Sequence, residues 1–334
     1  MTTLLLIDCQ KDFHPGGGSL EVPNADTDSV RITKFITDNI SSISRVVATM
    51  DSHHPLHIAH PHFWSDGRGN HPDPFTVISN QDIQNGKWIP REDIAVPPME
   101  QEILAQDTSN NNTVVPADLY DSSNGKLNIR QWCLEYTSRL ETKGKFQLMI
   151  WPEHCLIGTD GHNLTTNIAS SLMDWCRTTG GSVEWIHKGQ HLLTEMYSAL
   201  RAEVPVNTCT SFNYELMESV RRKFLENIIV SCFGKIYVQH NQLFVLISFN
   251  TTKFFSQLKQ SEKLIVCGQA LSHCVNFTIR DITSHWPKDK MNNIIILKDC
   301  SSTIPGFENV TDELLKHMVD LGVRVETTDS FKML

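Results

Sequence analysis

The chain of 334 residues lacks several features that would assign it to a specialised class of protein. It has no CxxC pair, and its nine cysteines are odd in number and irregularly spaced, which argues against a disulfide framework and favours a reducing compartment. No run approaches the roughly 18 apolar residues that indicate a transmembrane helix. No internal repeat or low-complexity tract is present. We therefore expect a globular protein without a membrane partner.

An excess of positive charge is also missing. The chain has 29 Lys and Arg against 38 Asp and Glu, a formal net charge of -9, and both signs are interspersed. This pattern argues against nucleic acid as a partner and favours a small or neutral substrate. The first eight residues pass directly into a strand pattern, without a charged leader region, cleavage site or Arg-rich presequence ahead of it. We expect a cytoplasmic location.

What the sequence does contain is a series of short apolar runs separated by amphipathic stretches of helix length. The runs are typical of fully buried, parallel strands, and their alternation with helices predicts an α/β fold with a mostly parallel sheet. The predicted strands are Leu4–Ile7, Arg45–Thr49, Gln147–Trp151, Ser182–Ile186, Leu264–Cys267, Ile294–Leu297 and Val323–Glu326. The predicted helices are Asp28–Asn39, Thr166–Thr178, Val275–Thr283 and Thr311–Leu321.

Two regions interrupt this alternation. Residues 65–145 are rich in Asn, Pro, Asp and Gly and contain one predicted helix, Leu127–Glu141, so we interpret them as a long loop or small subdomain inserted in a single domain that spans residues 1–334. Residues 203–261 are predicted to be a second insertion. Within it, residues 224–249 are unusually apolar and aromatic without a clean period, and are either an inserted hairpin or a segment foreign to the domain.

Polar residues gather where the predicted strands end, which is where ligands bind in an open α/β sheet. Asp51 and His53 follow the second strand and His154 follows the third. Two imidazoles and one carboxylate suit Zn²⁺, Fe²⁺ or Mn²⁺, with positions left open for water or substrate. The alternative for the Asp-x-His pair is a solvated loop. His54, His57, His60 and His62 crowd the same loop, and we expect most of them to lie at the surface or behind the ligands.

A second set comprises Asp8 after the first strand, Lys188 after the fourth, and Cys274 in the first turn of a helix after the fifth. The unpaired N–H groups of a helix start lower the pKa of a thiol, so Cys274 is placed to react. A carboxylate can take its proton and a cation can stabilise the thiolate. Each residue also has an ordinary explanation, because a strand-end Asp caps turns, a lysine is solvated and a cysteine packs in cores.

Five stretches together resemble the nicotinamidase branch of the isochorismatase-like cysteine hydrolases. Their order and mutual spacing match that family over roughly residues 1–60, 147–200 and 262–330, and the two predicted insertions lie outside the match. The stretches are Leu6-Ile-Asp8-Cys-Gln-Lys-Asp-Phe13, Asp51-Ser-His53-His-Pro-Leu-His57-Ile, Trp151-Pro-Glu-His154-Cys-Leu-Ile-Gly-Thr159, His187-Lys188-Gly189 through Tyr197-Ser-Ala, and Gly268-Gln-Ala-Leu-Ser-His-Cys274-Val.

The resemblance implies a three-layer α/β/α fold and a role for each matched residue. Cys274 is implied to be the nucleophile, Asp8 its general base and Lys188 the third member of the triad. The remaining implied residues are the metal ligands Asp51, His53 and His154 with His57 behind them, the ring-contacting Phe13 and Trp151, a cis peptide between Gln269 and Ala270, and an oxyanion hole formed by the N–H groups of Ala270 and Cys274.

The activity that this resemblance implies is hydrolysis of nicotinamide to nicotinate and ammonia through a thioester on Cys274. The implied cofactor is a divalent metal, zinc first and iron or manganese as alternatives, that binds the pyridine nitrogen. A homo-oligomer is expected. Because both insertions should emerge near the carboxyl edge of the sheet, another amide, a ureide or a carbamoyl compound remains an alternative substrate. A scaffold subunit without activity is a third hypothesis, disfavoured because all six polar residues are present.

Overall fold

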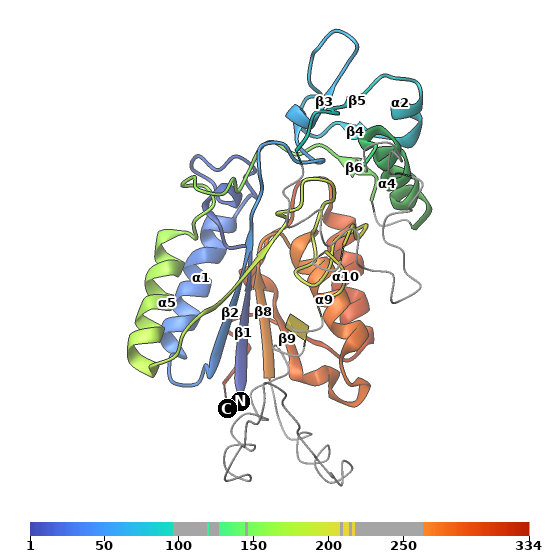
Figure 1. The fold of residues 1–334 in the computed structure, drawn as a ribbon. Helices are drawn as coiled ribbons and strands as arrows, with labels where there is room; N and C mark the ends of the chain where they lie inside the picture. Colours follow the sequence, from blue (N-terminus) through green and yellow to red (C-terminus); the bar gives the residue numbers. More distant parts are fainter. Residues whose placement is uncertain are drawn as a thin grey trace, which may run out of the picture.

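The computed structural model describes residues 1–95, 119, 127–143, 146–207, 210–213, 216–217 and 263–333. Its centre is a six-stranded sheet in the order β10-β9-β8-β1-β2-β7, in which every pair of neighbours is parallel (Figure 1). The strands are β1 (Thr2–Ile7), β2 (Arg45–Asp51), β7 (Glu184–Lys188), β8 (Lys263–Gly268), β9 (Ile294–Leu297) and β10 (Arg324–Glu326).

The central strands are buried on both faces, which explains why they are continuous apolar runs in the sequence. In β1, Leu5 and Ile7 belong to the hydrophobic cluster on one face of the sheet. Leu4 and Leu6 belong to the cluster on the other face. Successive side chains of a strand point to opposite faces, so a strand between two helical layers needs an apolar residue at every position.

Helices cover both faces of the sheet and complete three layers. Helices α1 (Ala25–Asp38) and α5 (Thr166–Thr179) pack together on one side, and α9 (Cys274–His285) and α10 (Glu308–Asp320) lie on the other (Figure 1). The predicted three-layer α/β/α fold with a parallel central sheet is therefore confirmed. Each of these helices lies within a few residues of its predicted range, because the 3.6-residue spacing of apolar side chains marks the buried face well.

A smaller unit lies beyond the carboxyl ends of the central strands (Figure 1). It contains two short antiparallel pairs, β3 (Trp64–Ser65) with β5 (Ile89–Pro90) and β4 (Val77–Ile78) with β6 (Leu148–Met149). It also contains α2 (Asn80–Gln84) and α4 (Ile129–Lys143), the latter close to the helix predicted in residues 127–141. The predicted segment 224–249 lies outside the described residues, so its fold stays a prediction.

Two strand predictions were wrong in their details. The run Gln147–Trp151 was predicted to be a buried parallel strand, but only Leu148–Met149 forms a strand, and it pairs antiparallel with β4 outside the central sheet. Its apolar residues are buried against the smaller unit. An apolar run predicts burial, but it does not predict which sheet the segment joins. The run Ser182–Ile186 corresponds to β7, which is an edge strand rather than a fully buried one, with the side chain of Trp185 48% exposed.

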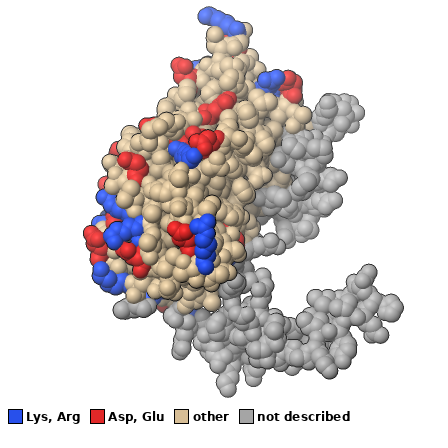
Figure 2. Space-filling view, turned by 90° about the vertical axis from the view of Figure 1, so that its left-hand side faces the viewer, with Lys and Arg blue, Asp and Glu red and all other residues tan. Residues whose placement is uncertain are grey.

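Charges of both signs are mixed on the face that carries α1 and α5, without a single-sign patch (Figure 2). Ion pairs within each helix contribute to this mixture, such as Lys34 with Asp38 in α1 and Arg177 with Asp174 in α5. This face offers no basic footprint for a polyanion. Among the described residues, no helix has both the length and the apolar character needed to cross a bilayer.

Candidate active site

The order of strands brings four of the predicted site residues together. Asp8 directly follows β1, Asp51 ends β2 and Lys188 ends β7, while Cys274 begins α9 after β8. Because β8, β1, β2 and β7 are consecutive neighbours in a parallel sheet, their carboxyl ends meet at one edge. Residues that are up to 266 positions apart in the sequence thus surround one point.

Two glycines let the backbone come close enough for these contacts. Gly268 ends β8 with φ +128°, and a Cβ there would collide with the backbone of Ile7, the residue before Asp8. Gly189 has φ +74°, and a Cβ would lie 2.6 Å from Oδ1 of Asp51. Both positive φ values are reached without strain only by glycine. The two glycines therefore set the spacing between the strand ends that carry the site.

The amino group of Lys188 is the centre of the first cluster. Its Nζ lies 2.9 Å from Oδ2 of Asp8 and 3.1 Å from Oδ1 of Asp51. It donates to the carbonyl of Met196 at 3.0 Å and contacts Sγ of Cys274 at 3.5 Å. The side chain of Lys188 is fully buried, and its positive charge partly compensates the charges of the two carboxylates. The structure thus joins the base, the cation and the thiol that the sequence proposed as a set.

The ionisation of this cluster follows from burial and from the neighbouring charges. Burial lowers the pKa of Lys188, but Asp51 and Asp8 outweigh it, so the pKa lies well above the ordinary value. Burial raises the pKa of Cys274 well above its ordinary value, although Lys188 acts to lower it. Burial thus opposes the lowering of the thiol pKa that the helix start favours. The thiol needs a base to remove its proton, and burial also raises the pKa of Asp8.

Asp51, His53 and His154 form the second cluster on the opposite side of Asp51. Nε2 of His53 lies 3.3 Å from Oδ1 of Asp51, and Nε2 of His154 lies 3.7 Å from Oδ2. The Nδ1 atoms are hydrogen-bonded to backbone carbonyls, those of Gly189 at 2.9 Å and Pro152 at 2.8 Å. A carbonyl accepts only from an N–H, so each Nδ1 donates, and Nε2 is the ring nitrogen that each imidazole turns toward the carboxylate.

These nitrogen and oxygen atoms could together bind a metal ion. Oδ1 of Asp51 and Nε2 of His53 are buried and have no hydrogen-bond partner. The ligand atoms of Asp51, His53 and His154 all lie within 4.8 Å of one another. Burial acts to raise the pKa of Asp51, but His53, Lys188 and His154 hold it well below its ordinary value, so the carboxylate stays anionic. Carbonyl-bonded imidazoles with an anionic carboxylate are a common donor set for divalent transition metals.

Two further histidines of the same loop, His57 and His60, are buried beside this set, and they differ in how many ring nitrogens are hydrogen-bonded. Both ring nitrogens of His57 are used, since Nε2 bonds the carbonyl of Thr194 at 3.0 Å and Nδ1 accepts from the N–H of Ala59 at 3.2 Å. His57 therefore supports the loop and has no lone pair to offer. Nδ1 of His60 bonds the carbonyl of His54 at 3.2 Å, whereas its Nε2 is buried without a partner.

His60 is a residue that the sequence analysis did not single out. Its ring centre lies 5.1 Å from that of His53 and 5.5 Å from that of His154. The sequence signal was only its place in a histidine-rich loop, which does not distinguish it from His54 or from the exposed His62. Only the fold shows that His60 is the one whose unpaired nitrogen is enclosed with the two predicted ligands.

His154 reaches the site by a different route from the one predicted. It does not end a strand of the central sheet but lies in a loop, held beside β2 by an isolated parallel bridge between His53 and Leu156. The N–H of His53 donates to the carbonyl of Cys155 at 3.1 Å, which fixes the two histidine-bearing segments together. The prediction that His154 lies near Asp51 and His53 assumed that it follows a strand of the central sheet. A loop bridged to the end of β2 places it there instead.

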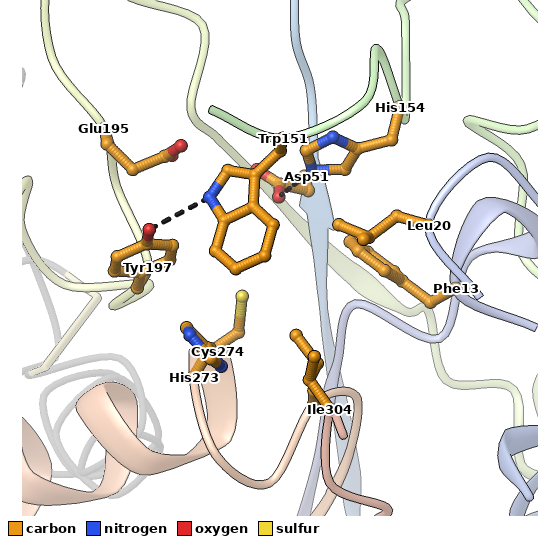
Figure 3. Close-up of a pocket in the computed structure, with 11 residues that line it drawn as sticks. Phe13, Leu20, Asp51, Trp151, His154, Glu195, Tyr197, His273, Cys274 and Ile304 are labelled. Carbon is orange, nitrogen blue, oxygen red and sulfur yellow. Dashed lines mark hydrogen bonds and ion pairs between the residues drawn. The ribbon is translucent and has the colours of Figure 1, made fainter. Parts of the chain in front are cut away.

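The two clusters share a wall of one pocket. The space between atoms there is about 330 Å³, including the part open to solvent. Figure 3 shows Cys274 and His273 below Trp151, with Glu195 and Tyr197 on one side and Phe13 and Leu20 on the other. The lining residues are Phe13, Leu20, Asp51, Trp151, His154, Glu195, Tyr197, Ala270, His273, Cys274 and Ile304.

Several lining residues were not predicted, although Phe13 and Trp151 were. Tyr197 belongs to a quoted stretch, and its hydroxyl accepts from Nε1 of Trp151 at 3.0 Å, which holds the indole in place. Glu195 and His273 also lie in quoted stretches but were given no role, and Leu20 and Ile304 come from loops without a distinctive local pattern. Their contribution depends on how distant segments pack, which one sequence does not reveal.

The smaller unit makes aromatic contacts with residues that line this pocket. The ring of Phe146 stacks on His273 with centres 5.0 Å apart and an angle of 19°, and it also contacts Phe277 and Phe307. Burial lowers the pKa of His273 to about 3, so its imidazole is neutral. Phe75 contacts the edge of Trp151 with centres 5.9 Å apart. Within residues 65–95, Phe75 therefore contacts a residue that lines the pocket.

The turn before α9 leaves two backbone N–H groups beside Cys274. The peptide bond between Gln269 and Ala270, which the resemblance expects to be cis, is cis in the structure. The amides of Ala270 and Cys274 donate to no acceptor among the described residues, whereas the amides of Gln269, Leu271 and His273 each do. Unpaired amides next to a nucleophile can stabilise a developing oxyanion.

No protein-family model matches the chain, and no curated protein matches it either. Among solved structures, the yeast nicotinamidase Pnc1p bound to the inhibitor nicotinaldehyde is similar with a TM-score of 0.51 and 16% identity, over 98% of this chain and 100% of that chain. A nicotinamidase and pyrazinamidase of Acinetobacter baumanii is similar with a TM-score of 0.50 and 17% identity, over 98% of this chain and 96% of that chain. The protein therefore has the α/β fold of these nicotinamidase structures.

Proposed function

We propose that the protein is a metal-dependent cysteine amidohydrolase that converts nicotinamide and water to nicotinate and ammonia. The observation that carries this proposal is the shared pocket of the two clusters. On its wall lie the thiol of Cys274, in contact with a cation that is paired to Asp8, and the carboxylate of Asp51, which faces Nε2 of two imidazoles. A thiol with its base and a metal-binding donor set are the two parts that such a reaction needs.

In the proposed reaction, Asp8 accepts the proton of Cys274 and the thiolate attacks the amide carbon. Lys188 stabilises the thiolate through the contact at 3.5 Å. The N–H groups of Ala270 and Cys274 donate to the oxyanion of the tetrahedral intermediate, a contribution of about 3 kcal/mol for one such donor in comparable sites. The carbon–nitrogen bond then breaks, the proton passes from Asp8 to the amine, and ammonia leaves a thioester on Cys274.

The donor set fits a divalent metal, because the Nε2 atoms of two imidazoles face an anionic carboxylate, where an ion would take the place of a proton. Asp51, His53 and His154 would hold the ion, and the unpartnered Nε2 of His60 lies in a neighbouring group with His53 and His57. Zinc is the first candidate and Fe²⁺ or Mn²⁺ the alternatives, since imidazole and carboxylate ligands suit all three. When bound, the ion would supply a Lewis acid that takes the pyridine nitrogen and so orients the ring.

The shape and chemistry of the pocket support a flat heteroaromatic amide as substrate. Phe13 and Leu20 face Tyr197 across it, with Trp151 above the thiol (Figure 3). A ring can lie between these apolar surfaces while its carboxamide points to Cys274. Another planar amide is the second candidate. It is favoured by the contact of Phe146, from the smaller unit, with His273, which lines the pocket.

We also propose the chain organisation that accompanies this function. The hydrolase would be a single domain over residues 1–334, with residues 65–145 and 203–261 as insertions at the pocket side and with homo-oligomerisation in solution. The described part of the first insertion supports this arrangement, because it lies beyond the carboxyl ends of the strands (Figure 1).

The test is ammonia release from nicotinamide by the purified full chain, before and after removal of metal with a chelator. We expect release that is lost on chelation and restored by zinc, iron or manganese. His62→Ala is a matched control, because His62 lies in the same loop but is exposed and bonded to Glu153 rather than to the donor set. Undiminished release from fully demetallated protein would contradict the metal-dependent part of the proposal.

A further inference from the structure

The second half of the proposed reaction, hydrolysis of the thioester, needs a base for water inside the pocket. Asp8 is poorly placed for this step. Its Oδ1 accepts from the hydroxyl of Thr49 at 2.6 Å, its Oδ2 is paired with Lys188 at 2.9 Å, and the residue does not line the pocket. Asp51 lines the pocket, but its oxygens face Lys188, His53 and His154. Both carboxylates are thus paired with Lys188, and of the two only Asp51 lines the pocket.

Glu195 is the other carboxylate that lines the pocket, and its carboxylate points toward the middle of the pocket in Figure 3. The residue is 4% exposed. Its backbone is fixed on both sides, because its N–H donates to the hydroxyl of Tyr136 at 3.2 Å and its carbonyl accepts from the N–H of Glu203 at 2.9 Å. The loop after β7 therefore holds Glu195 at one position.

The carboxylate of Glu195 is only partly compensated. One oxygen accepts from the N–H of Met196 at 2.8 Å, and no side chain among the described residues donates to the carboxylate. Burial raises the pKa of Glu195, and the charge of His53 only partly opposes this rise. A carboxylate on the wall of a reaction pocket that binds a proton more readily than usual is suited to accept one from water.

A second cavity lies on the other side of Glu195. It has about 250 Å³ of space between atoms, including the part open to solvent. Glu195 and Tyr197 border both cavities, and Tyr136, Phe146 and Glu203 border only the second. Its hydroxyl and carboxylate groups offer partners to water. Water can thus reach Glu195 from this side while an acyl group on Cys274 fills the first pocket.

We propose that Glu195 is the general base for hydrolysis of the acyl-enzyme, a role that rests on the proposed cysteine hydrolase function. Its carboxylate takes a proton from water as the oxygen attacks the thioester carbon. The tetrahedral intermediate collapses with cleavage of the carbon–sulfur bond, and the electron pair stays on sulfur as a thiolate next to Lys188. The proton then passes from Glu195 to the thiolate, so that acid and free thiol are the products of thioester and water.

The experiment separates the two half-reactions with p-nitrophenyl acetate, which acylates a reactive thiol whatever its natural amide. In the full chain with bound metal, Glu195→Gln should give a p-nitrophenol burst equal to the enzyme concentration at the wild-type rate. The steady-state rate that follows should fall about 100-fold or more, the loss expected for removal of a general base. Intact mass spectrometry should then find the acetyl group retained on the protein.

Two controls test alternative explanations of that result. Glu135→Gln changes a carboxylate of α4 that pairs with Arg139 and borders neither cavity, and it should leave both phases within about twofold of wild type. Hydroxylamine attacks a thioester without a base, so it should restore turnover of the Glu195→Gln acyl-enzyme. Because glutamine keeps the oxygen that accepts from Met196, and the burst counts working sites, misfolding is separated from loss of the base.

Each result has a distinct meaning. A Glu195→Gln variant that turns over the ester at the wild-type rate, or that loses the burst together with the steady state, overturns the assignment of Glu195. Wild-type protein that shows the burst but releases no ammonia from nicotinamide contradicts the proposed substrate, while a retained acetyl group in Glu195→Gln still supports the base. Wild-type protein that is not acylated by the ester contradicts both proposals.

Discussion

The two halves of the site are built on opposite electrostatic principles. In the thiol cluster, the amino group of Lys188 compensates the carboxylates of Asp8 and Asp51, and the cluster is complete with the groups that the chain provides. In the histidine cluster, Nε2 of His53 and Nε2 of His154 both face the carboxylate of Asp51, as the donor atoms of a metal site would. The first cluster is therefore arranged to move a proton, and the second is arranged to receive a cation.

Asp51 belongs to both clusters and couples them. Its Oδ1 lies 3.1 Å from Nζ of Lys188 and 3.3 Å from Nε2 of His53. A change of charge on one side of this carboxylate is felt on the other, since both pairs are buried and poorly screened. Variants that disable one cluster, with the other cluster measured separately, show how far the two depend on each other.

The largest expected effect comes from Cys274→Ala. Removal of the nucleophile should reduce ammonia release from nicotinamide by on the order of 10⁴-fold or more, as for other covalent catalysts that lose their nucleophile. The metal content, measured by inductively coupled plasma mass spectrometry, should stay at the wild-type level, because the thiol lies outside the set Asp51, His53 and His154. Loss of metal together with activity would show that the two clusters are not separate.

The next effect is expected from His53→Ala, which removes a ligand and leaves the thiol cluster in place. Metal affinity should fall by about 100-fold or more, beyond the loss seen when a residue that only orients a ligand is changed. Isothermal titration with zinc measures it, and His62→Ala is the control. Alkylation of Cys274 by iodoacetamide should persist in His53→Ala. Unchanged zinc affinity in this variant would contradict the assignment of the donor set.

The pH dependence of thiol reactivity gives a third test. Since the pKa of Cys274 lies well above the ordinary value of 9.0, the thiolate fraction, and with it the alkylation rate, should still be rising when the pH passes 9.0. Below that pH the rate should change about tenfold per unit, as for a group far from its midpoint. Lys188→Met should raise the pKa further and slow alkylation at any fixed pH.

A plateau of the alkylation rate near neutral pH would contradict this account of the thiol cluster. It would mean that Cys274 is a thiolate before substrate binds, as a helix start beside a lysine suggests. The effect of burial on the pKa of Cys274 would then be smaller than the effect of these groups. Mass mapping of the alkylated peptide is needed, because six other described cysteines are free. Five of those six are buried, and none of the six lines the pocket.

The smallest effect is expected from Phe146→Ala, which touches neither cluster. Loss of the stack on His273 should weaken substrate binding by about 0.5–1.5 kcal/mol, the range for an aromatic pair, and so raise KM several-fold. The value of kcat and the zinc affinity should remain close to wild type. A large fall in kcat would show that the smaller unit takes part in the chemistry rather than in substrate fit.

Much of this arrangement could be predicted from the sequence, because strand ends of a parallel sheet converge by topology alone. The apolar runs of β1, β2 and β8 and the polar residues after them were sufficient to group Asp8, Asp51 and Cys274. The three-layer fold followed from the same alternation of strands and helices. Residues that depend on the path of the backbone between strands were harder to predict.

The elements that were missed share one physical cause. His60 and Glu195 lie in loops, and their burial depends on segments far away in the sequence that pack over them. The run Gln147–Trp151 is apolar because it is buried by the smaller unit, and apolarity does not say which sheet a strand joins. The pKa of Cys274 also depends on burial, which a local motif does not report. Tertiary packing decides each of these properties.

The most direct test of the central claim is to trap the thioester. Metal-loaded wild-type protein is mixed with nicotinamide, quenched in acid within the first turnover, digested and mapped by mass spectrometry. The account predicts a nicotinoyl group on the peptide that contains Cys274, with one equivalent of ammonia released. Ammonia release without an adduct in any quenched sample, or a nicotinoyl group on another cysteine such as Cys155, would contradict it.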